Sequence, residues 1–452
     1  MKKLFVLFVS LIFSLSLVFT GCDGEDDDSG GLIPGAESGG GSVSGPGVTV
    51  LRPSPCQRIY GAMDINLSPN SPDKVETAYV TLNNLVVAVF DGGGGYATTL
   101  PASDLPVDGS YILEAVVVYK DGTSVSDEVN IRIDRTAPFV YNYLVLDSAA
   151  DPMGLGGKPG ALFRVDVASG LICTLASSKM FSSPSAMAIQ ADGTILVTDL
   201  GADMDGDGPG VGTIFRVLPD RYNNVTVFKS SGLFRGPVGI DIDPVGGVIY
   251  VVDYDADPLN LTASDKGPGA VFAINPNTLN VTTVMSNMQL VSPIGVTIDS
   301  SGDLLIADAD ANPNDPVDSQ YHGSAWKYVT STGDLQLLSG STSFITPFKL
   351  LETPGGDLLL ADSGYNSQGA LFEIVPGVST TVLVDSYPLL TPAGMVYDAE
   401  TGTYLIADRN ADTLKDGNRG AILRYDPVGG STTFFILSDR FVEPFDVKIS
   451  LD

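Results

Sequence analysis

The sequence predicts an all-β chain in which a six-bladed β-propeller follows a smaller β-sandwich. Three observations support this prediction. Short apolar runs separated by glycine-rich turns recur along the chain, the pattern after residue 140 repeats every 45–56 residues, and the two ends of the repeating part are incomplete in complementary ways. Four short strands per repeat at such a period are typical of propeller blades.

Each repeat contains a proline that begins a first strand and an aspartate that ends the second strand. A glycine, a small residue and two further strands complete the repeat, as in "GALFRV" and "GTIFRV". The prolines are Pro184, Pro237, Pro293, Pro347, Pro392 and Pro444. The strand-end aspartates are Asp147, Asp199, Asp253, Asp308, Asp362 and Asp408.

The ends of the repeating part indicate how the ring closes. Residues 140–177 contain a second, third and fourth strand but lack a first, whereas the terminal "PFDVKISLD" is a first strand with nothing after it. We therefore expect the C-terminal strand to complete the N-terminal blade of a propeller spanning 140–452. This pairing would leave no open sheet edge.

The first residues, "MKKLFVLFVSLIFSLSLVFTGC", have the lysines, the short apolar run and the small residues of an export signal. The ending "LVFTGC" resembles the lipobox of bacterial lipoproteins. This resemblance implies a signal peptide over 1–21 and a diacylglycerol on the Cys22 thiol, and the alternative is an ordinary cleaved signal. Asp23 resembles the inner-membrane retention signal of enterobacterial lipoproteins. The expected location is the bacterial cell envelope, lipid-anchored on the extracytoplasmic side.

Residues 22–48 are rich in Gly, Ser and Asp, and we expect a flexible tether there. Residues 49–136 contain strand-like runs with turn signals between them, which predicts a small β-sandwich. The closing "IRIDRTAP" resembles the end of bacterial immunoglobulin-like domains. A spacer or docking module is the expected role of this part, because no motif in it indicates chemistry.

The charge balance excludes one class of partner. The chain has 54 acidic and 24 basic residues and a net charge of −30. Nucleic acid and anionic lipid headgroups would be repelled, whereas cations or cationic proteins suit such a surface. Besides Cys22, only Cys56 and Cys173 are present, far apart in the sequence. We expect them to be two buried thiols, without a disulfide framework.

The stretch "DMDGDG", which contains Asp203, Asp205 and Asp207, matches the first half of an EF-hand loop. The Glu expected at the twelfth position is absent, since Ile214 stands there. A calcium loop of another type and a solvated acidic turn both remain open.

The six strand-end aspartates recur in every repeat, which favours a structural role, because a catalytic group is usually needed once. A carboxylate at a strand end accepts backbone N–H groups and ties the loop in place. The loops that begin at these aspartates, with the six aspartates included, contain 18 acidic and 5 basic residues. All six connect second to third strands, so they belong to one face, and we expect this acidic face to be the functional surface.

The repeat "PVGIDIDPVGGVIYVVD…GAVFAINPNT" resembles the NHL repeat and, more broadly, the gluconolactonase-like six-bladed propellers. These families include lactonases, lyases and binding proteins, so the resemblance indicates a fold better than a function. The enzymes hold a divalent metal near the channel with Glu, Asn and Asp. The first strands here offer Asp241, Glu352 and Asp446, without a clear match.

Two functions therefore remain open. One is a lipid-tethered binding or scaffolding propeller that engages a cationic or metal-bridged partner. The other is a metal-dependent, lactonase-like hydrolase. His322 is the only histidine, which excludes a three-histidine zinc site, and no nucleophile motif stands near it. This favours binding over catalysis.

Overall fold

The computed structural model describes residues 46–135, 141–157, 159–166, 170–204, 212–219, 222–259, 268–311, 322–341, 343–411 and 419–451. Within these residues the regular structure is β-strand, apart from three single-turn 3₁₀ helices, η1 (Pro72–Lys74), η2 (Ala102–Asp104) and η3 (Tyr365–Ser367). The predicted all-β class is confirmed. No helix in the described part is long and apolar enough to cross a membrane. The chain divides into two compact units, 46–53 with 59–135, and 54–58 with the described residues from 141 onward.

The first unit consists of two antiparallel sheets that share one apolar core. Every second residue of the facing strands is buried in this core. Examples are Val50 and Ile65 on one sheet and Val80, Leu113 and Ile131 on the other. This alternation is the period-2 pattern of half-buried strands. The smaller sheet has the order β1 (Val48–Arg52), β3 (Met63–Pro69), β6 (Ala97–Leu100), and the larger β2 (Arg58–Ile59), β8 (Ser124–Ile133), β7 (Gly109–Tyr119), β4 (Val75–Leu82), β5 (Leu85–Asp91).

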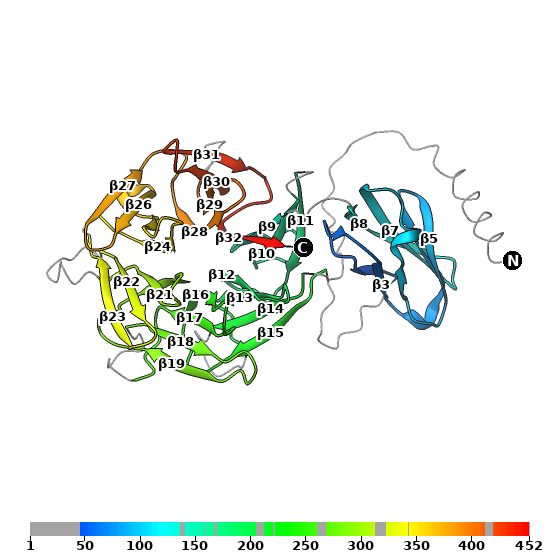
Figure 1. Cartoon of the computed structure of the whole chain (residues 1–452). Coiled ribbons are helices and arrows are strands. Elements are labelled where there is room, and N and C mark those ends of the chain that lie inside the picture. Colours follow the sequence, from blue (N-terminus) through cyan, green and yellow to red (C-terminus); the bar gives the residue numbers. More distant parts are fainter. Residues whose placement is uncertain are drawn as a thin grey trace. The chain divides into compact units, whose positions relative to one another are not determined.

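The second unit contains six antiparallel sheets of four strands each, and five of them are made from consecutive strands (Figure 1). Their members are β12 (Pro184–Ile189), β13 (Ile195–Asp199), β14 (Thr213–Val217) and β15 (Val225–Ser230); β16 (Pro237–Ile242), β17 (Ile249–Asp253), β18 (Ala270–Ile274) and β19 (Val281–Met285); β20 (Pro293–Ile298), β21 (Leu304–Asp308), β22 (Ser324–Val329) and β23 (Asp334–Ser339); β24 (Pro347–Glu352), β25 (Leu358–Asp362), β26 (Ala370–Val375) and β27 (Ser379–Val384); β28 (Pro392–Asp398), β29 (Thr403–Asp408), β30 (Ala421–Asp426) and β31 (Ser431–Ile436).

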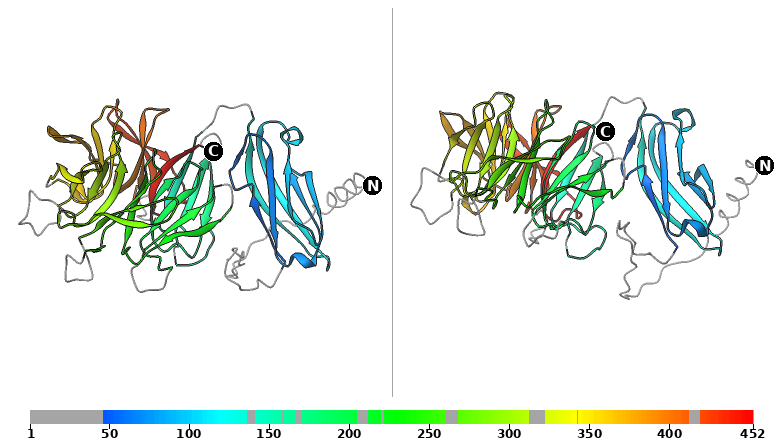
Figure 2. Two further views of the ribbon diagram at one scale, coloured as in Figure 1. Left: turned by 60° about the horizontal axis from the view of Figure 1, so that its bottom comes forward. Right: turned by 90° about the horizontal axis from the view of Figure 1, so that it is seen from below.

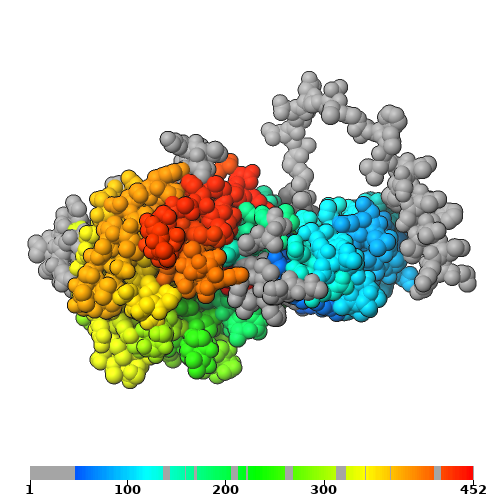
Figure 3. Space-filling view, turned by 45° about the horizontal axis from the view of Figure 1, so that its top comes forward, coloured from blue at the N-terminus to red at the C-terminus, as the bar shows by residue number. Residues whose placement is uncertain are grey.

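The remaining sheet joins the two ends of the repeating part. Its order is β11 (Leu171–Ser177), β10 (Ala161–Asp166), β9 (Tyr141–Asp147), β32 (Pro444–Leu451), and β32 runs antiparallel to β9. The predicted pairing of the C-terminal strand with the first sheet is therefore observed. Figures 2 and 3 show the red C-terminal residues beside the green strands that begin this unit.

The first strands of the six sheets surround a common axis. Each contacts the first strand of the next sheet, and β32 contacts both β28 and β12, so the series closes on itself. In Figure 1 these strands lie innermost, and the fourth strands β15, β19, β23, β27 and β31 lie outermost. The chain therefore forms a closed ring of sheets, as in propeller-type folds.

A glycine and a proline couple each sheet to the next. A Cβ at Gly323, which precedes β22, would lie 2.3 Å from Cδ of Pro347 in the next sheet. The same clash with the next proline ring would occur in all six sheets, and Gly420 meets Pro444 at the closure. Only glycine leaves room for this contact, which explains why both residues recur. The pairs are Gly160–Pro184, Gly212–Pro237, Gly269–Pro293, Gly323–Pro347, Gly369–Pro392 and Gly420–Pro444.

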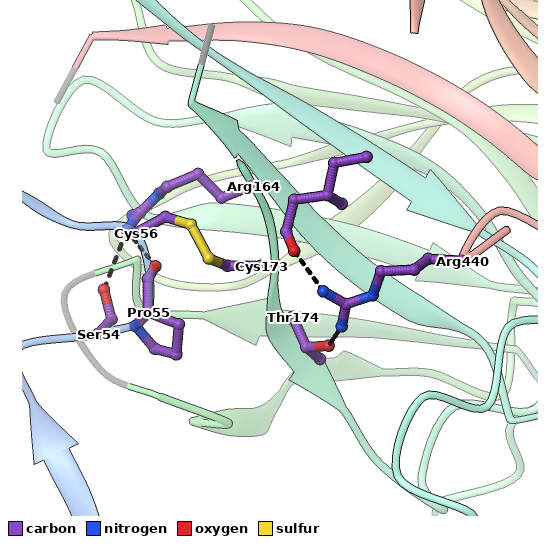
Figure 4. Close-up of a disulfide and its surroundings, with 8 residues drawn as sticks. Ser54, Pro55, Cys56, Arg164, Cys173, Thr174 and Arg440 are labelled. Atoms are coloured by element: carbon purple, nitrogen blue, oxygen red, sulfur yellow. Dashed lines mark hydrogen bonds between the residues drawn. A yellow bond between two sulfur atoms is a disulfide. The ribbon is translucent and has the colours of Figure 1, made fainter. Parts of the chain in front are cut away.

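The expectation of two buried thiols is wrong, because Cys56 and Cys173 form a disulfide (Figure 4). The segment 54–58 belongs to the second unit, and the residues that it contacts lie around β10 and β11. Buried Arg58 forms an ion pair with Asp166 at 2.9 Å, and Arg164 donates to Oγ of Ser54 at 3.0 Å. The two cysteines are 117 residues apart in the sequence, so their pairing could not be predicted from their spacing.

Candidate functional site

The strand-end aspartates lie where β-strands meet the loops of the predicted functional face. Asp308 illustrates their geometry, with a side chain that is fully buried. Its Oδ2 accepts the backbone N–H of Val291 at 2.9 Å, and its Oδ1 accepts those of Ser292, Asp310 and Ala311 at 3.0–3.1 Å. Two of these donors precede the first strand of the same sheet, and two follow Asp308 itself. One carboxylate therefore fixes both loops.

The other five aspartates are equally buried and make the same kind of contacts. Asp147 extends the pattern across the closure, because it accepts the N–H groups of Val442 and Glu443, just before β32, as well as those of Ala149 and Ala150. The remaining acceptors are Asp199 (from Ser182, Ser183 and Gly201), Asp253 (from Arg235, Gly236 and Asp255), Asp362 (from Ile345, Thr346, Gly364 and Tyr365) and Asp408 (from Leu390, Thr391 and Asn410).

Burial governs the protonation of these groups. Removal from water raises the pKa of Asp253, Asp308 and Asp408 to about 6, although the N–H donors oppose the rise. The pKa values of Asp147, Asp199 and Asp362 are raised for the same reason. Six of the 18 acidic residues counted for the loops are therefore buried and hydrogen-bonded, and they add no exposed charge to this face.

The candidate calcium loop is only partly described. Asp203 is exposed at the end of the described segment, whereas Asp205 and Asp207 lie outside the described residues, as do the candidate lipidation site Cys22 and Asp23. Among the residues that the structure describes, no group of three or more His, Cys, Asp or Glu is arranged to hold a metal ion. The calcium site stays a prediction.

The three carboxylates that the sequence placed near the channel do not form a group that could hold a metal ion among the described residues. Asp241 accepts the N–H of Ile298 at 2.9 Å, and Asp446 accepts that of Met187 at 3.0 Å. Glu352 accepts both N–H and Oγ–H of Ser300, at the opposite end of the strand from Pro347. Each carboxylate is thus bonded to a neighbouring sheet.

A lysine lies near the axis instead, which sequence reasoning did not consider. Lys349 is 8 % exposed, and its Nζ donates to the carbonyl of Val296 at 2.8 Å. Burial and the nearby Lys448 lower the pKa of Lys349 to about 8. Glycines in the first strands let neighbouring strands approach one another closely around the axis. A Cβ at Gly295 would overlap the carbonyl of Phe348, and one at Gly394 would overlap Asp446. The axis at this level is therefore packed with protein groups.

His322 directly precedes Gly323 and is 8 % exposed. It ends a loop that contains four aspartates, and most of that loop, 312–321, lies outside the described residues. Its position beside the glycine–proline contact places it at the loop's return into β22.

No family model and no curated protein matches the chain. Among solved structures, a chain of the nidogen/laminin complex is similar to 69 % of this chain and 98 % of its own length, at 12 % identity and a TM-score of 0.50. The Pseudomonas aeruginosa periplasmic gluconolactonase matches 69 % of this chain and all of its own, at 14 % identity and a TM-score of 0.44. A putative 6-phosphogluconolactonase from Bacteroides fragilis matches 70 % and 100 %, at 13 % identity and 0.45.

These similarities concern the fold alone. At 12 % identity, the nidogen/laminin chain supports a propeller-type architecture and gives no information on ligand or activity. The two lactonases match with lower TM-scores, of 0.44 and 0.45.

Proposed function

We propose that this chain is an extracytoplasmic binding or scaffolding protein, held on a bacterial membrane through a lipid on Cys22. In this proposal the six sheets are the blades of an NHL-like six-bladed propeller, and the first unit is an immunoglobulin-like spacer or docking domain. The propeller binds a cationic or metal-bridged protein partner through its acidic loop face. Nucleic acid is not a ligand, because the net charge of −30 would repel it.

The observation that carries this proposal is the way in which the loops are anchored. Each loop after a second strand begins at a buried carboxylate that is bonded to backbone N–H groups. These carboxylates are therefore engaged in holding the fold. What varies from sheet to sheet is the loop beyond the anchor, and rigid scaffolds with variable loops are typical of binding surfaces.

The disulfide supports an extracytoplasmic location. Disulfides persist in oxidising compartments and are rare in the cytosol. Cys56 and Cys173 lie in a buried cluster with two arginines, Arg58 and Arg164, that are both engaged. The bond also closes a loop of more than a hundred residues, for which the chain-entropy model gives a stabilisation of about 5 kcal/mol.

The location is tested by expressing the full chain with its own signal and with Cys22→Ala in a bacterium. We expect the unaltered chain in the membrane fraction, carrying a lipid by mass spectrometry, with an oxidised Cys56–Cys173 pair. The Cys22→Ala chain should lose the lipid. Unlipidated protein with reduced cysteines in the cytosol would contradict this part of the proposal.

The binding face is tested by crosslinking the anchored protein on cells. We expect a crosslinked partner that is lost on Asp203→Asn with Asp257→Asn, which removes two charges from the loop face. The matched control, Glu76→Gln with Asp91→Asn, removes two exposed charges from the first unit and should retain the partner. Equal loss in both variants would attribute binding to net charge and contradict a specific face.

The metal question is answered by calorimetric titration of Ca²⁺ into the chelator-treated chain. Saturable binding that disappears on Asp205→Ala with Asp207→Ala would support a calcium loop at Asp203, Asp205 and Asp207. Binding that survives the double substitution would point to another site, and lactonase assays would then test the hydrolase alternative. No binding would contradict both metal hypotheses.

A further inference from the structure

A groove lies between two neighbouring sheets of the ring, those of β24–β27 and β28–β31. It is at the end where first strands turn into second strands, because Glu352 pairs with Leu358 there, whereas Pro347 pairs with Asp362 at the loop end. The hollow measures about 730 Å³ with its open mouth, within the usual size of small-molecule sites. It is remote along the strand from the acidic loop face and does not depend on the function proposed above.

Three tyrosines form a row along one side of this groove. The strand register places Tyr397 opposite Tyr404, and Tyr404 opposite Tyr425. Their ring centroids are 5.0 Å and 6.2 Å apart, respectively. Three adjacent strands thus present neighbouring, mutually tilted rings toward the next sheet, where Leu383 packs against the same cluster.

The two inner tyrosines are buried residues whose hydroxyl groups bond to none of the described residues. Tyr404 and Tyr425 are each 3 % exposed and line the groove. Neither oxygen is among the buried polar atoms that lack a partner, so both hydroxyls reach the solvent that fills the groove. Burial raises the pKa of Tyr404 to about 12, so this hydroxyl stays protonated. Two polar atoms in the groove wall therefore remain available to a ligand.

A carboxylate without a counter-ion faces the same space. Glu373, on β26, lines the groove and is half-buried, and the described residues supply it with neither an ion pair nor a hydrogen bond. Its charge contributes to the raised pKa of Tyr425, behind the effect of burial. An acceptor-only group and two phenol oxygens together match a ligand that donates several N–H bonds.

A second hollow continues from the first, because both are lined by Thr353, Pro354 and Tyr397. It contains a second carboxylate, that of Glu352. Among the residues that line the two hollows, there is no lysine, arginine or histidine. The joined groove therefore has a carboxylate in each half, aromatic rings between them and no positive charge of its own.

We propose that this groove binds a linear organic polycation, a diamine or polyamine, with one ammonium group at Glu373 and the phenols of Tyr404 and Tyr425, and another at Glu352. Ammonium groups donate three hydrogen bonds and are attracted to tyrosine faces. The methylene chain suits the apolar floor around Pro354 and Leu383. The strong negative charge of the chain would also raise the local concentration of such a ligand.

The test is calorimetric titration of spermidine into the full chain at about 150 mM salt, where exposed charges are largely screened. We expect saturable one-to-one binding. Glu373→Gln should weaken it about tenfold or more, since it removes a charged hydrogen-bond acceptor. Tyr404→Phe and Tyr425→Phe should each weaken it severalfold. A tyrosine difference spectrum should appear on addition of spermidine and shrink in both phenylalanine variants.

The matched control is Glu76→Gln, which removes the same charge from an exposed strand of the first unit. It should leave spermidine binding unchanged. Equal weakening by Glu373→Gln and Glu76→Gln would reduce the effect to counter-ion attraction and overturn the proposal. Absence of saturable binding in a folded chain, or binding of the neutral sugar cellobiose in place of spermidine, would also overturn it. Fluorescence of buried Trp326, the chain's single tryptophan, verifies that each variant is folded.

Discussion

The loop end of every sheet in the ring and the groove at the turn end of two neighbouring sheets differ in how their polar groups are bonded. At the loop end, six buried carboxylates each accept several backbone N–H groups, and the arrangement recurs in every sheet. At the turn end, Glu373, Tyr404 and Tyr425 occur in one place only, and the described residues offer them no hydrogen-bond partner. A repeated, saturated group serves the fold, whereas a single, unsaturated group is free to serve a ligand.

The largest effect should come from disturbing the loop end at Gly323. In Gly323→Ala the new Cβ would lie 2.3 Å from Pro347 Cδ and 2.7 Å from the carbonyl oxygen of Asp308, both in rigid surroundings. We expect a loss of about 3 kcal/mol in the free energy of unfolding of the second unit, measured by urea titration of Trp326 fluorescence.

Gly355→Ala is the control for this change. A Cβ at Gly355 would approach only Thr353 Oγ1, at 3.7 Å, which is ordinary contact. Its unfolding free energy should stay within about 0.5 kcal/mol of the unaltered chain. Similar losses for both variants would show that the glycine–proline contact does not couple the sheets.

The next effect concerns the saturated carboxylates directly. Asp308→Asn replaces one acceptor oxygen by an NH₂ group that faces backbone N–H donors, so at least one donor would lose its partner. We expect a loss of about 2 kcal/mol at pH 7 by the same fluorescence titration. Asp357→Asn, a half-buried aspartate at the end of the turn before β25, should change little. If Asp308→Asn were equally harmless, the aspartate would not anchor the loops.

The pH dependence of stability tests the protonation of the same group. Because burial raises the pKa of Asp308 to about 6 from an unfolded value near 3.8, the folded state binds more protons between these values. This contribution to stability is full below about pH 4 and is lost as the pH rises to about 6. The difference in stability between the unaltered chain and Asp308→Asn should therefore decrease from pH 4 to pH 7. An increase would mean that the four N–H donors outweigh burial.

Sequence reasoning succeeded where the signal was periodic. The strand-end aspartates could be predicted because they recur six times, and the pairing of β32 with β9 followed from the incomplete ends of the repeating part. The coupling of Gly323 to Pro347 was also within reach, since both residues recur, but their contact joins different repeats. The Cys56–Cys173 disulfide occurs once and bridges 117 residues, so no spacing indicated it.

The groove could not be predicted from the sequence, because it depends on strand register and on the packing of neighbouring sheets. Tyr397, Tyr404 and Tyr425 form a row only because the strand register aligns them, and a shift by one residue would turn each to the other face. Glu373 comes from the neighbouring sheet, and its lack of a partner depends on everything around it. An unsatisfied group is a property of the packed molecule, which no single motif expresses.

The smallest expected effect is the sharpest test of the contrast between saturated and unsaturated groups. Tyr119, in the first unit, and Tyr404 are both 3 % exposed, but only the hydroxyl of Tyr119 is engaged, with the carbonyls of Asn70 at 2.6 Å and Gly47 at 2.7 Å. Tyr119→Phe should therefore cost its unit about 1–2 kcal/mol, by amide hydrogen exchange. Tyr404→Phe should lower the free energy of unfolding by less than about 0.5 kcal/mol, because the Tyr404 hydroxyl gives the fold no hydrogen bond. The same variant should weaken spermidine binding. A Tyr404→Phe chain as destabilised as Tyr119→Phe would place this hydroxyl among the groups that hold the fold, and the groove would lose its argument for a ligand.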